Sequence, residues 1–229
     1  MRLLQEVGVD KQNIILSTQI EDDYTAMQQD YGDSATVIFG AATSVAENRN
    51  TLLDYCCANG IRRVMFLDDD VSALLVYSDG KFRKLTANEF LPTVRLCFRI
   101  AQDAGATIFG FFYCDNALFS RGRNPTLNEL IVAAAMGILD TRVRFDTAFR
   151  IKEDYELACR LIHEGCRTLR FNNLAMRYGF MQNGGCRTEY DRGGREAASI
   201  QLVNKYPQLV DLRPDGEVKL INKNKQRKK

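Results

Sequence analysis

Three consecutive aspartates, Asp68 to Asp70, follow an apolar run at residues 64–67 and precede another at 71–75. Carboxylates this close raise each other's pKa unless a cation compensates their charge. Mn2+ or Mg2+ would do so, because hard cations take oxygen ligands. On an extended backbone Asp68 and Asp70 share one face while Asp69 points away. The pattern predicts a metal-binding carboxylate pair; the alternative is a strand end with one aspartate starting a turn and two in solvent.

A second acidic pair, Glu153 and Asp154, opens the helical stretch 151–165. Its apolar residues stand three, four, seven and eight positions after Asp154, which places Asp154 on the inward face and Lys152 on the outward one. An inward carboxylate at a helix start either caps backbone amides or acts as a general base in a cleft. The only histidine, His163, lies on the opposite side of this helix, and we interpret it as an exposed or half-buried helix residue.

Arg49 stands between Asn48 and Asn50 near the start of another predicted helix, ahead of the aspartates. The planar guanidinium of arginine suits a diphosphate or a pyrimidine edge. The alternative is a surface ion pair with Glu47 or Asp54.

The elements that must position these residues alternate between helix and strand. Helices are predicted at 2–8, 22–32, 45–60, from Thr86 or Asn88 to 105 with Pro92 in the first turn, and at 151–165; strands are predicted at 13–18, 35–40, 62–70, 106–113 and 170–180, and residues 127–139 fit either type. This alternation predicts an α/β fold with a mostly parallel sheet covered by helices. In such sheets ligands bind outside the carboxyl ends of the strands, where the aspartates fall.

Composition limits the classes of protein that remain. A chain of 229 residues with 45% hydrophobic residues can bury one core, so we expect a single domain at residues 1–212 and a basic tail at 213–229. Its 31 basic and 29 acidic residues nearly balance, so any contact with nucleic acid must be local. Seven cysteines without a Cys-x-x-Cys pair indicate a reducing compartment, and no segment is apolar for long enough to span a membrane, so we expect a cytoplasmic protein.

The ordered set of motifs resembles the GT-A nucleotide-sugar glycosyltransferases. "ENRN" at 47–50 is similar to their Arg-Asn helix, "VMFLDDDV" at 64–71 to their metal-binding Asp-x-Asp strand, and "KEDYELACRLIHEG" at 152–165 to the helix that carries the base of inverting members. More closely, "NIILSTQIEDDY", "RFDTAFRIKEDYELACRLI" and "LRFNNLAMRYGFMQNGGC" resemble the TET-associated glycosyltransferases, over roughly residues 10–190. That group is related to the base J glucosyltransferase and includes phage enzymes that glycosylate 5-hydroxymethylcytosine in DNA.

The resemblance implies transfer of a sugar from a UDP-sugar, with UDP-glucose as the expected donor, to a hydroxyl acceptor, with inversion and with Mn2+ or Mg2+. For a phage protein the location would be the host cytoplasm. It implies that Asp70 binds the metal, that Asp68 binds the metal or the ribose, that Asp69, Arg49, Gln19 and Glu21 lie at the nucleotide sugar, and that Asp154 takes the proton of the acceptor. Residues 183–186 would form a loop over the sugar diphosphate.

The resemblance also implies 5-hydroxymethylcytosine in DNA as the acceptor. The DNA phosphates could then contact "SRGRN" at 120–124 or the arginines at 167, 170, 177, 187, 192 and 195. A base turned out of the duplex could enter a pocket formed by Phe111, Phe112, Tyr113 and Phe119, although residues 111–113 also fit the core. Two alternatives remain open: a GT-A transferase acting on protein or glycan, and a non-catalytic protein of the same fold.

One departure from the family concerns the first strand. The GT-A sheet normally opens with a strand ahead of the first helix, whereas this sequence starts at that helix. Either such a strand lies upstream of the given start, or residues 216–222 fill its place in a permuted order.

Overall fold

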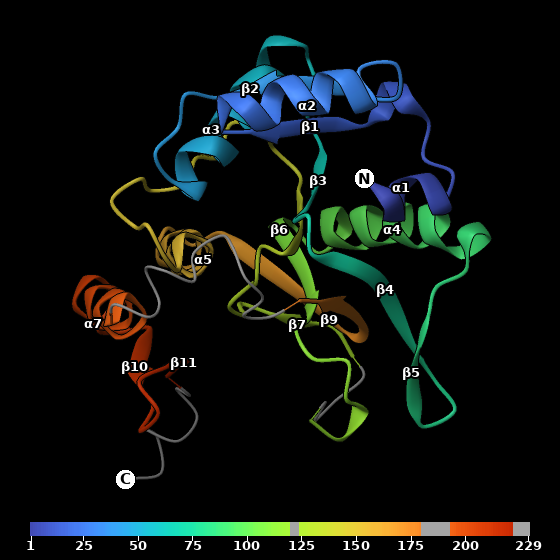
Figure 1. Cartoon of the computed structure of the whole chain (residues 1–229). Helices are drawn as coiled ribbons and strands as arrows, with labels where there is room; N and C mark the ends of the chain where they lie inside the picture. Colours follow the sequence, from blue (N-terminus) through green and yellow to red (C-terminus); the bar gives the residue numbers. More distant parts are fainter. Residues whose placement is uncertain (120–123, 180–192, 222–229) are drawn as a thin grey trace, which may run out of the picture.

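The computed structural model describes residues 1–119, 124–179 and 193–221. It is an α/β structure in which helices flank a mixed central sheet (Figure 1). In chain order the elements are α1 (Arg2–Glu6), η1 (Lys11–Asn13), β1 (Ile15–Thr18), α2 (Glu21–Tyr31), β2 (Thr36–Phe39), α3 (Val45–Ala58), β3 (Val64–Leu67), β4 (Val71–Ser78), β5 (Lys81–Lys84), α4 (Ala87–Asp103), β6 (Ala106–Phe112), η2 (Ala117–Phe119), β7 (Thr126–Leu127), β8 (Ala135–Ile138), α5 (Glu153–His163), β9 (Arg167–Tyr178), α7 (Arg195–Lys205), β10 (Val210–Leu212) and β11 (Val218–Leu220).

The central sheet has the strand order β3-β8-β6-β9-β4-β5, and β7 pairs with β9. Strands β3, β6 and β9 run in the same direction, as a parallel sheet requires, and β6 pairs with β9 in parallel. However, β8 lies antiparallel between β3 and β6, and the β4–β5 hairpin extends the sheet antiparallel beyond β9. The predicted α/β class is confirmed, but the central sheet is mixed rather than mostly parallel, because β8 inserts between β3 and β6 and β4 adds antiparallel beside β9.

The local signals that begin the helices agree with the sequence. Ser44 caps α3 by accepting a hydrogen bond from the backbone N–H of Glu47, and Thr86 and Glu89 form a capping box at the start of α4. Pro92 was expected in the first turn of α4, but it is the sixth residue counted from Ala87 and so lies in the second turn. The N-cap at Thr86 fixes this offset.

The β4–β5 hairpin was missed, although its turn carries a recognisable signal. Asp79 and Gly80 at the turn have positive φ angles of 52° and 84°, which suits an Asp-Gly pair in a two-residue hairpin. The ambiguous segment 127–139 holds no helix: β7 and β8 lie near its ends with irregular backbone between them. The residues of β8 are buried because β8 is an inner strand of the sheet, whereas Leu127 of β7 is 44% exposed.

The two faces of the sheet carry separate cores. One contains Phe109, Phe111 and Phe171 together with the inner side of α4, and the other packs α3 and α5 around Leu53 and Leu157. A third cluster joins the C-terminal elements to α5, through Phe149, Cys159, Leu202, Tyr206, Val210 and Val218. The C-terminal helix and hairpin are therefore packed on the same helix that begins with Glu153.

Strands β1 and β2 form a separate parallel pair, seen at the top of Figure 1 above the central sheet. The permuted arrangement expected for residues 216–222 is wrong: the described part of this segment forms β11, which pairs with β10 instead. The residues from 213 onward, expected as a tail, include β11. Within the described part of the chain, no helix is long and apolar enough to cross a membrane.

Candidate functional site

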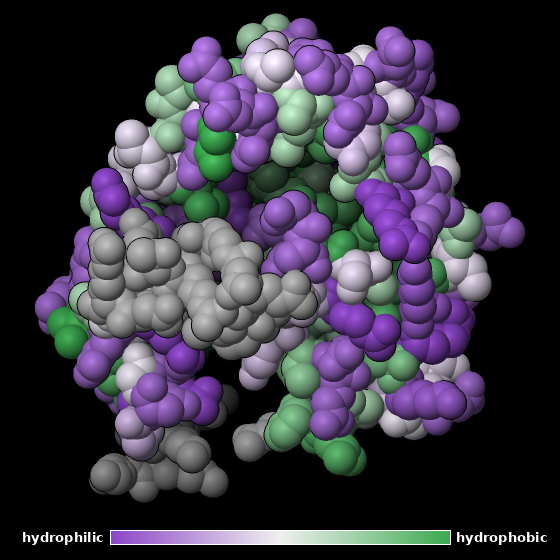
Figure 2. All heavy atoms as spheres, viewed as in Figure 1, coloured by the Kyte–Doolittle hydropathy of each residue, from purple (hydrophilic) through white to green (hydrophobic). Residues whose placement is uncertain are grey.

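The candidate site lies in a cleft of about 2590 Å³ bordered by β1, β3, α3, α5 and the β10–β11 hairpin. Figure 2 shows the opening as a recess with an apolar wall beneath a polar rim. Leu52, Met65 and Phe66 contribute to the apolar part, and the acidic residues at the end of β3 and the start of α5 line the same cleft. Two sequence motifs far apart in the chain thus meet in one place.

The aspartates form a turn rather than the end of an extended strand. The N–H of Val71 donates to the carbonyl of Asp68 at 3.1 Å, and Asp69 and Asp70 occupy the middle of this turn between β3 and β4. The expectation that Asp68 and Asp70 share a face by strand alternation is therefore wrong. The chain must turn here because β4 leaves β3 to pair with β5 and β9, several strands away in the sheet.

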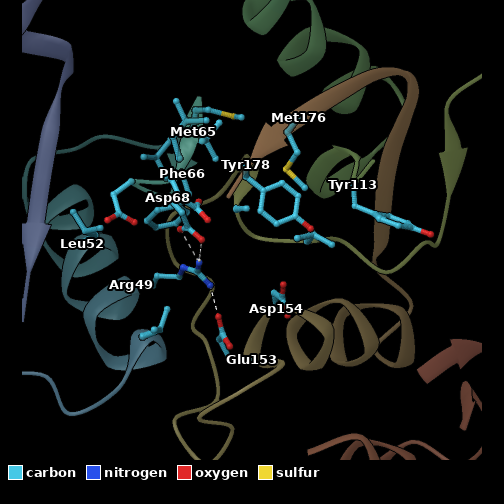
Figure 3. A pocket seen from close by; sticks show the side chains of 18 of the residues that line it. Arg49, Leu52, Met65, Phe66, Asp68, Tyr113, Glu153, Asp154, Met176 and Tyr178 are labelled. Atoms are coloured by element: carbon cyan, nitrogen blue, oxygen red, sulfur yellow. Dashed lines mark hydrogen bonds and ion pairs between the residues drawn. The ribbon is translucent and has the colours of Figure 1, made fainter. Parts of the chain in front are cut away.

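Arg49 joins the two acidic motifs (Figure 3). Its guanidinium donates to Asp68 at 2.9 and 3.1 Å and also to Glu153, and it lies over the ring of Phe145. Burial opposes the charge of Arg49, but the carboxylates of Asp68 and Glu153 outweigh burial and raise its pKa. Arg49 lines the cleft, and its ion pairs connect the end of β3 to the start of α5. The alternative of a surface ion pair with Glu47 or Asp54 is wrong, because Arg49 is buried and pairs with Asp68 and Glu153. Its contact with a nucleotide sugar stays a prediction.

Asp154 faces inward, as the helical pattern predicted, and lines the cleft. Its Oδ2 accepts a hydrogen bond from the backbone N–H of Ala133 at 3.0 Å, and its Oδ1 accepts one from Tyr155 at 2.7 Å. Burial raises the pKa of Asp154, while the Ala133 amide and the charge of Arg49 act in the opposite direction. A carboxyl with a raised pKa in a cleft is suited to accept a proton.

At the end of β3, Arg49 pairs with Asp68, and Asp69 and Asp70 add further negative charge that would suit a divalent cation. Partial desolvation and the charges of Asp68 and Asp69 raise the pKa of Asp70, as expected where carboxylates crowd together. Within the described residues, no group of three or more His, Cys, Asp or Glu side chains is arranged so that it could hold a metal ion by itself. Asp70 and Asp68 could thus supply two oxygen ligands, and a bound diphosphate and water the rest, as Mg2+ sites usually do.

Not all of the other residues predicted to contact the nucleotide sugar line the cleft. Gln19 follows β1, and both Gln19 and Asp69 line the cleft. Glu21 is the exposed first residue of α2 and is not among the residues that line the cleft. The structure therefore brings together Arg49, the three aspartates, Gln19 and Asp154.

Two site residues were not singled out from the sequence. Tyr178, the last residue of β9, points its phenol toward Asp154 in Figure 3, and burial together with the charges of Asp154 and Asp70 raises its pKa to about 12. Lys152 was expected to face outward, but it is buried and lines the cleft. The only available signal was position: Tyr178 is the last residue of the predicted strand at 170–180, and ligands bind outside the carboxyl ends of strands.

The residues suggested for a DNA acceptor are only partly free. Phe111 and Phe112 are buried in the core, whereas Tyr113 and Phe119 are 47% and 66% exposed. The described arginines among the candidates each have a partner: Arg167 with the Ala104 carbonyl, Arg170 with Glu129, Arg177 with Asp115 and Arg195 with Glu217. His163 is exposed and contacts Gln208, which agrees with its interpretation as a helix residue.

Several predictions lie outside the described residues. These are the basic residues of 120–123, the glycine loop 183–186, Arg187, Arg192 and the basic run 222–229. A comparison with known proteins gives no further support, since no family model, curated protein or solved structure matches the chain. The geometry of the cleft is therefore the basis for a functional assignment.

Proposed function

We propose that the chain is a metal-dependent glycosyltransferase of the GT-A type that moves a sugar from a UDP-sugar to a hydroxyl acceptor. The observation that supports this proposal is the meeting of three motifs in one cleft: the aspartates after β3, Arg49 of α3 and Asp154 at the start of α5. A Rossmann-like α/β sheet with its acidic residues at a strand end is compatible with nucleotide binding there.

In this proposal each side chain has one role. A metal held by Asp70 and Asp68 would neutralise charge on the leaving diphosphate. Arg49 holds Asp68 in place through its ion pair, and Asp154 receives the proton of the attacking hydroxyl. The apolar wall around Phe66 and Leu52 excludes water from the nucleotide side of the cleft, and attack from the opposite side of the sugar would invert its configuration.

We propose 5-hydroxymethylcytosine in DNA as the acceptor. Tyr113 and Tyr178 line the cleft and offer flat aromatic surfaces near Asp154, which would suit a base turned out of the duplex. A protein or glycan acceptor is the alternative within the same reaction.

A non-catalytic binding protein is the second candidate function, and one observation favours it. Both oxygens of Asp154 already accept backbone hydrogen bonds, as they would in a purely structural role. For such a protein, the wild type and the Asp154→Asn variant would bind DNA equally well, and neither would consume sugar nucleotide.

The proposal is tested by incubating the protein with Mn2+, UDP-glucose and one of three acceptors: hydroxymethylated DNA, a peptide mixture or an oligosaccharide mixture. Mass spectrometry of the digested products should show a hexose on hydroxymethylcytosine and none with Asp154→Asn. Glu164→Gln, an exposed control at the C-terminal end of α5, should act like the wild type. A hexose found only on peptide or only on glycan would show that the acceptor is protein or glycan and not DNA. If no hexose is transferred and no UDP is released from UDP-glucose with any of the three acceptors, the proposed activity is refuted.

A further inference from the structure

Lys152, the residue directly before Glu153 and Asp154, is held in an unfavourable state. Its backbone has φ 62° and ψ 27°, the left-handed region that residues other than glycine rarely adopt. Its side chain is only 6% exposed, and its positive charge lies at the N-terminus of α5, where the helix dipole favours negative charge. Such a conformation persists only where the surrounding structure enforces it.

The C-terminal hairpin provides that enforcement. The Nζ of Lys152 donates to Oε2 of Glu217 at 2.6 Å and lies 5.2 Å from the centre of the Tyr155 ring. The other carboxylate oxygen of Glu217 accepts a hydrogen bond from Arg195, at the start of α7. The backbone carbonyl of Glu217 accepts one from the N–H of Arg213 at 2.6 Å, which closes the turn between β10 and β11. Glu217 is therefore fixed on three sides.

The backbone of Lys152 controls where Asp154 lies. Its carbonyl accepts the first hydrogen bond of α5, from the N–H of Glu156 at 2.9 Å, so its φ and ψ set the direction of the first helical turn. Asp154 sits in that turn, and its carboxylate accepts a hydrogen bond at 3.0 Å from the N–H of Ala133, in the segment between β7 and β8. A rotation at Lys152 would move the carboxylate away from this amide.

We propose that Lys152 is a positioning residue for the carboxylate of Asp154, and that Glu217 thereby makes the β10–β11 hairpin part of the site. This inference rests on the proposed function only in taking Asp154 as the base. Lys152 acts through the backbone: the ion pair with Glu217 holds its left-handed conformation, and that conformation holds Asp154 on Ala133.

The test compares four variants with the wild type. Lys152→Met and Glu217→Gln remove the ion pair, Lys152→Arg keeps the charge, and Lys152→Gly lacks the side chain but adopts the left-handed region readily. The matched control is Lys219→Met, which removes an exposed lysine of the same hairpin that pairs with Asp211. Two quantities are measured: hydrogen exchange of the Ala133 amide by NMR, and kcat and KM for the donor. Melting temperatures identify any variant that fails to fold.

In Lys152→Met and Glu217→Gln we expect the Ala133 amide to exchange roughly 10-fold faster. We also expect kcat to fall by roughly 10- to 100-fold, with KM for the donor changing by less than about 3-fold. Lys152→Arg and Lys152→Gly should retain the protection of Ala133. Unchanged exchange in the Met and Gln variants would overturn the inference, and so would equal losses of protection in Lys152→Gly and Lys152→Met. If the wild type shows no turnover, the proposed function fails, while the exchange of Ala133 still decides the positioning role.

Discussion

Arg49 and Asp68 form a two-point ion pair, with Nη2 at 2.9 and 3.1 Å from the two carboxylate oxygens, that ties helix α3 to the end of β3. The same guanidinium reaches Glu153 at the start of α5. The side chains of Arg49 and Glu153 are 7% and 9% exposed, so this bridge is almost fully removed from water. One arginine therefore determines the relative position of the predicted metal ligands and the predicted base.

Above pH 7, where Glu153 is ionised in the folded protein, Arg49→Met should lower the free energy of unfolding by about 3–5 kcal/mol, because it leaves the buried carboxylate of Glu153 without its partner. The double variant Arg49→Met/Glu153→Met should recover most of that loss, since it removes both charges. Urea denaturation measures both values. A loss of less than about 1 kcal/mol in the single variant would show that the bridge does not contribute as the structure indicates.

The stability of the protein should depend on the ionisation of Glu153. Burial raises its pKa from 4.5 to about 7, outweighing the opposing charge of Arg49. Between these two pH values the folded state keeps a proton on Glu153 that the unfolded state releases. The contribution of Glu153 to the free energy of unfolding is therefore fully present below pH 4.5 and is lost as the pH rises toward 7. Glu153→Gln should remove this part of the decline in unfolding free energy, measured by denaturation at several pH values. Glu164→Gln, an exposed control, should keep the wild-type slope; equal slopes in all three proteins would refute the prediction.

Mn2+ and UDP together should raise the melting temperature more than Mn2+ alone. A ligand at about 100 times its Kd adds roughly 2.7 kcal/mol, which corresponds to roughly 5–10 °C in a domain of this size. Asp70→Asn and the addition of EDTA should each abolish the UDP-dependent rise, whereas Asp103→Asn, an exposed control on α4, should not. A rise that survives both treatments would place the nucleotide away from the aspartates.

The edges of β1 and β3 that border the cleft should accept an added strand. By strand alternation, the amides of Ser17 and Met65 point away from the paired strands β2 and β8 and toward the cleft. An apolar strand of about five residues, fused ahead of Met1 through a short linker, should pair with both edges in parallel. A polar extension of equal length is the control.

The expected result is a higher melting temperature and slower hydrogen exchange at Ser17 and Met65 for the apolar extension only. Exchange that is already slow at both amides in the unextended chain would contradict the prediction, because it would mean that these edges are not open.

Much of the local structure and the choice of site residues follow from the sequence by itself. Apolar periodicity indicated the helices that begin near Val45, Ala87 and Glu153, and it predicted the inward direction of Asp154. These features depend on residues close together in the chain, where helix geometry and capping leave few options. The position of Asp68 at the end of a strand was predictable for the same reason.

The tertiary structure decided everything that depends on distant pairing. It placed β8 between β3 and β6, turned the chain at Asp69 and Asp70, and gave Arg49 its partner Glu153, 104 residues away. It also buried Lys152 against Glu217, contrary to the helical pattern, because an ion pair with the C-terminal hairpin outweighs the local preference for solvent. Such contacts depend on which elements pack together, and the spacing of residues along one element does not contain that information.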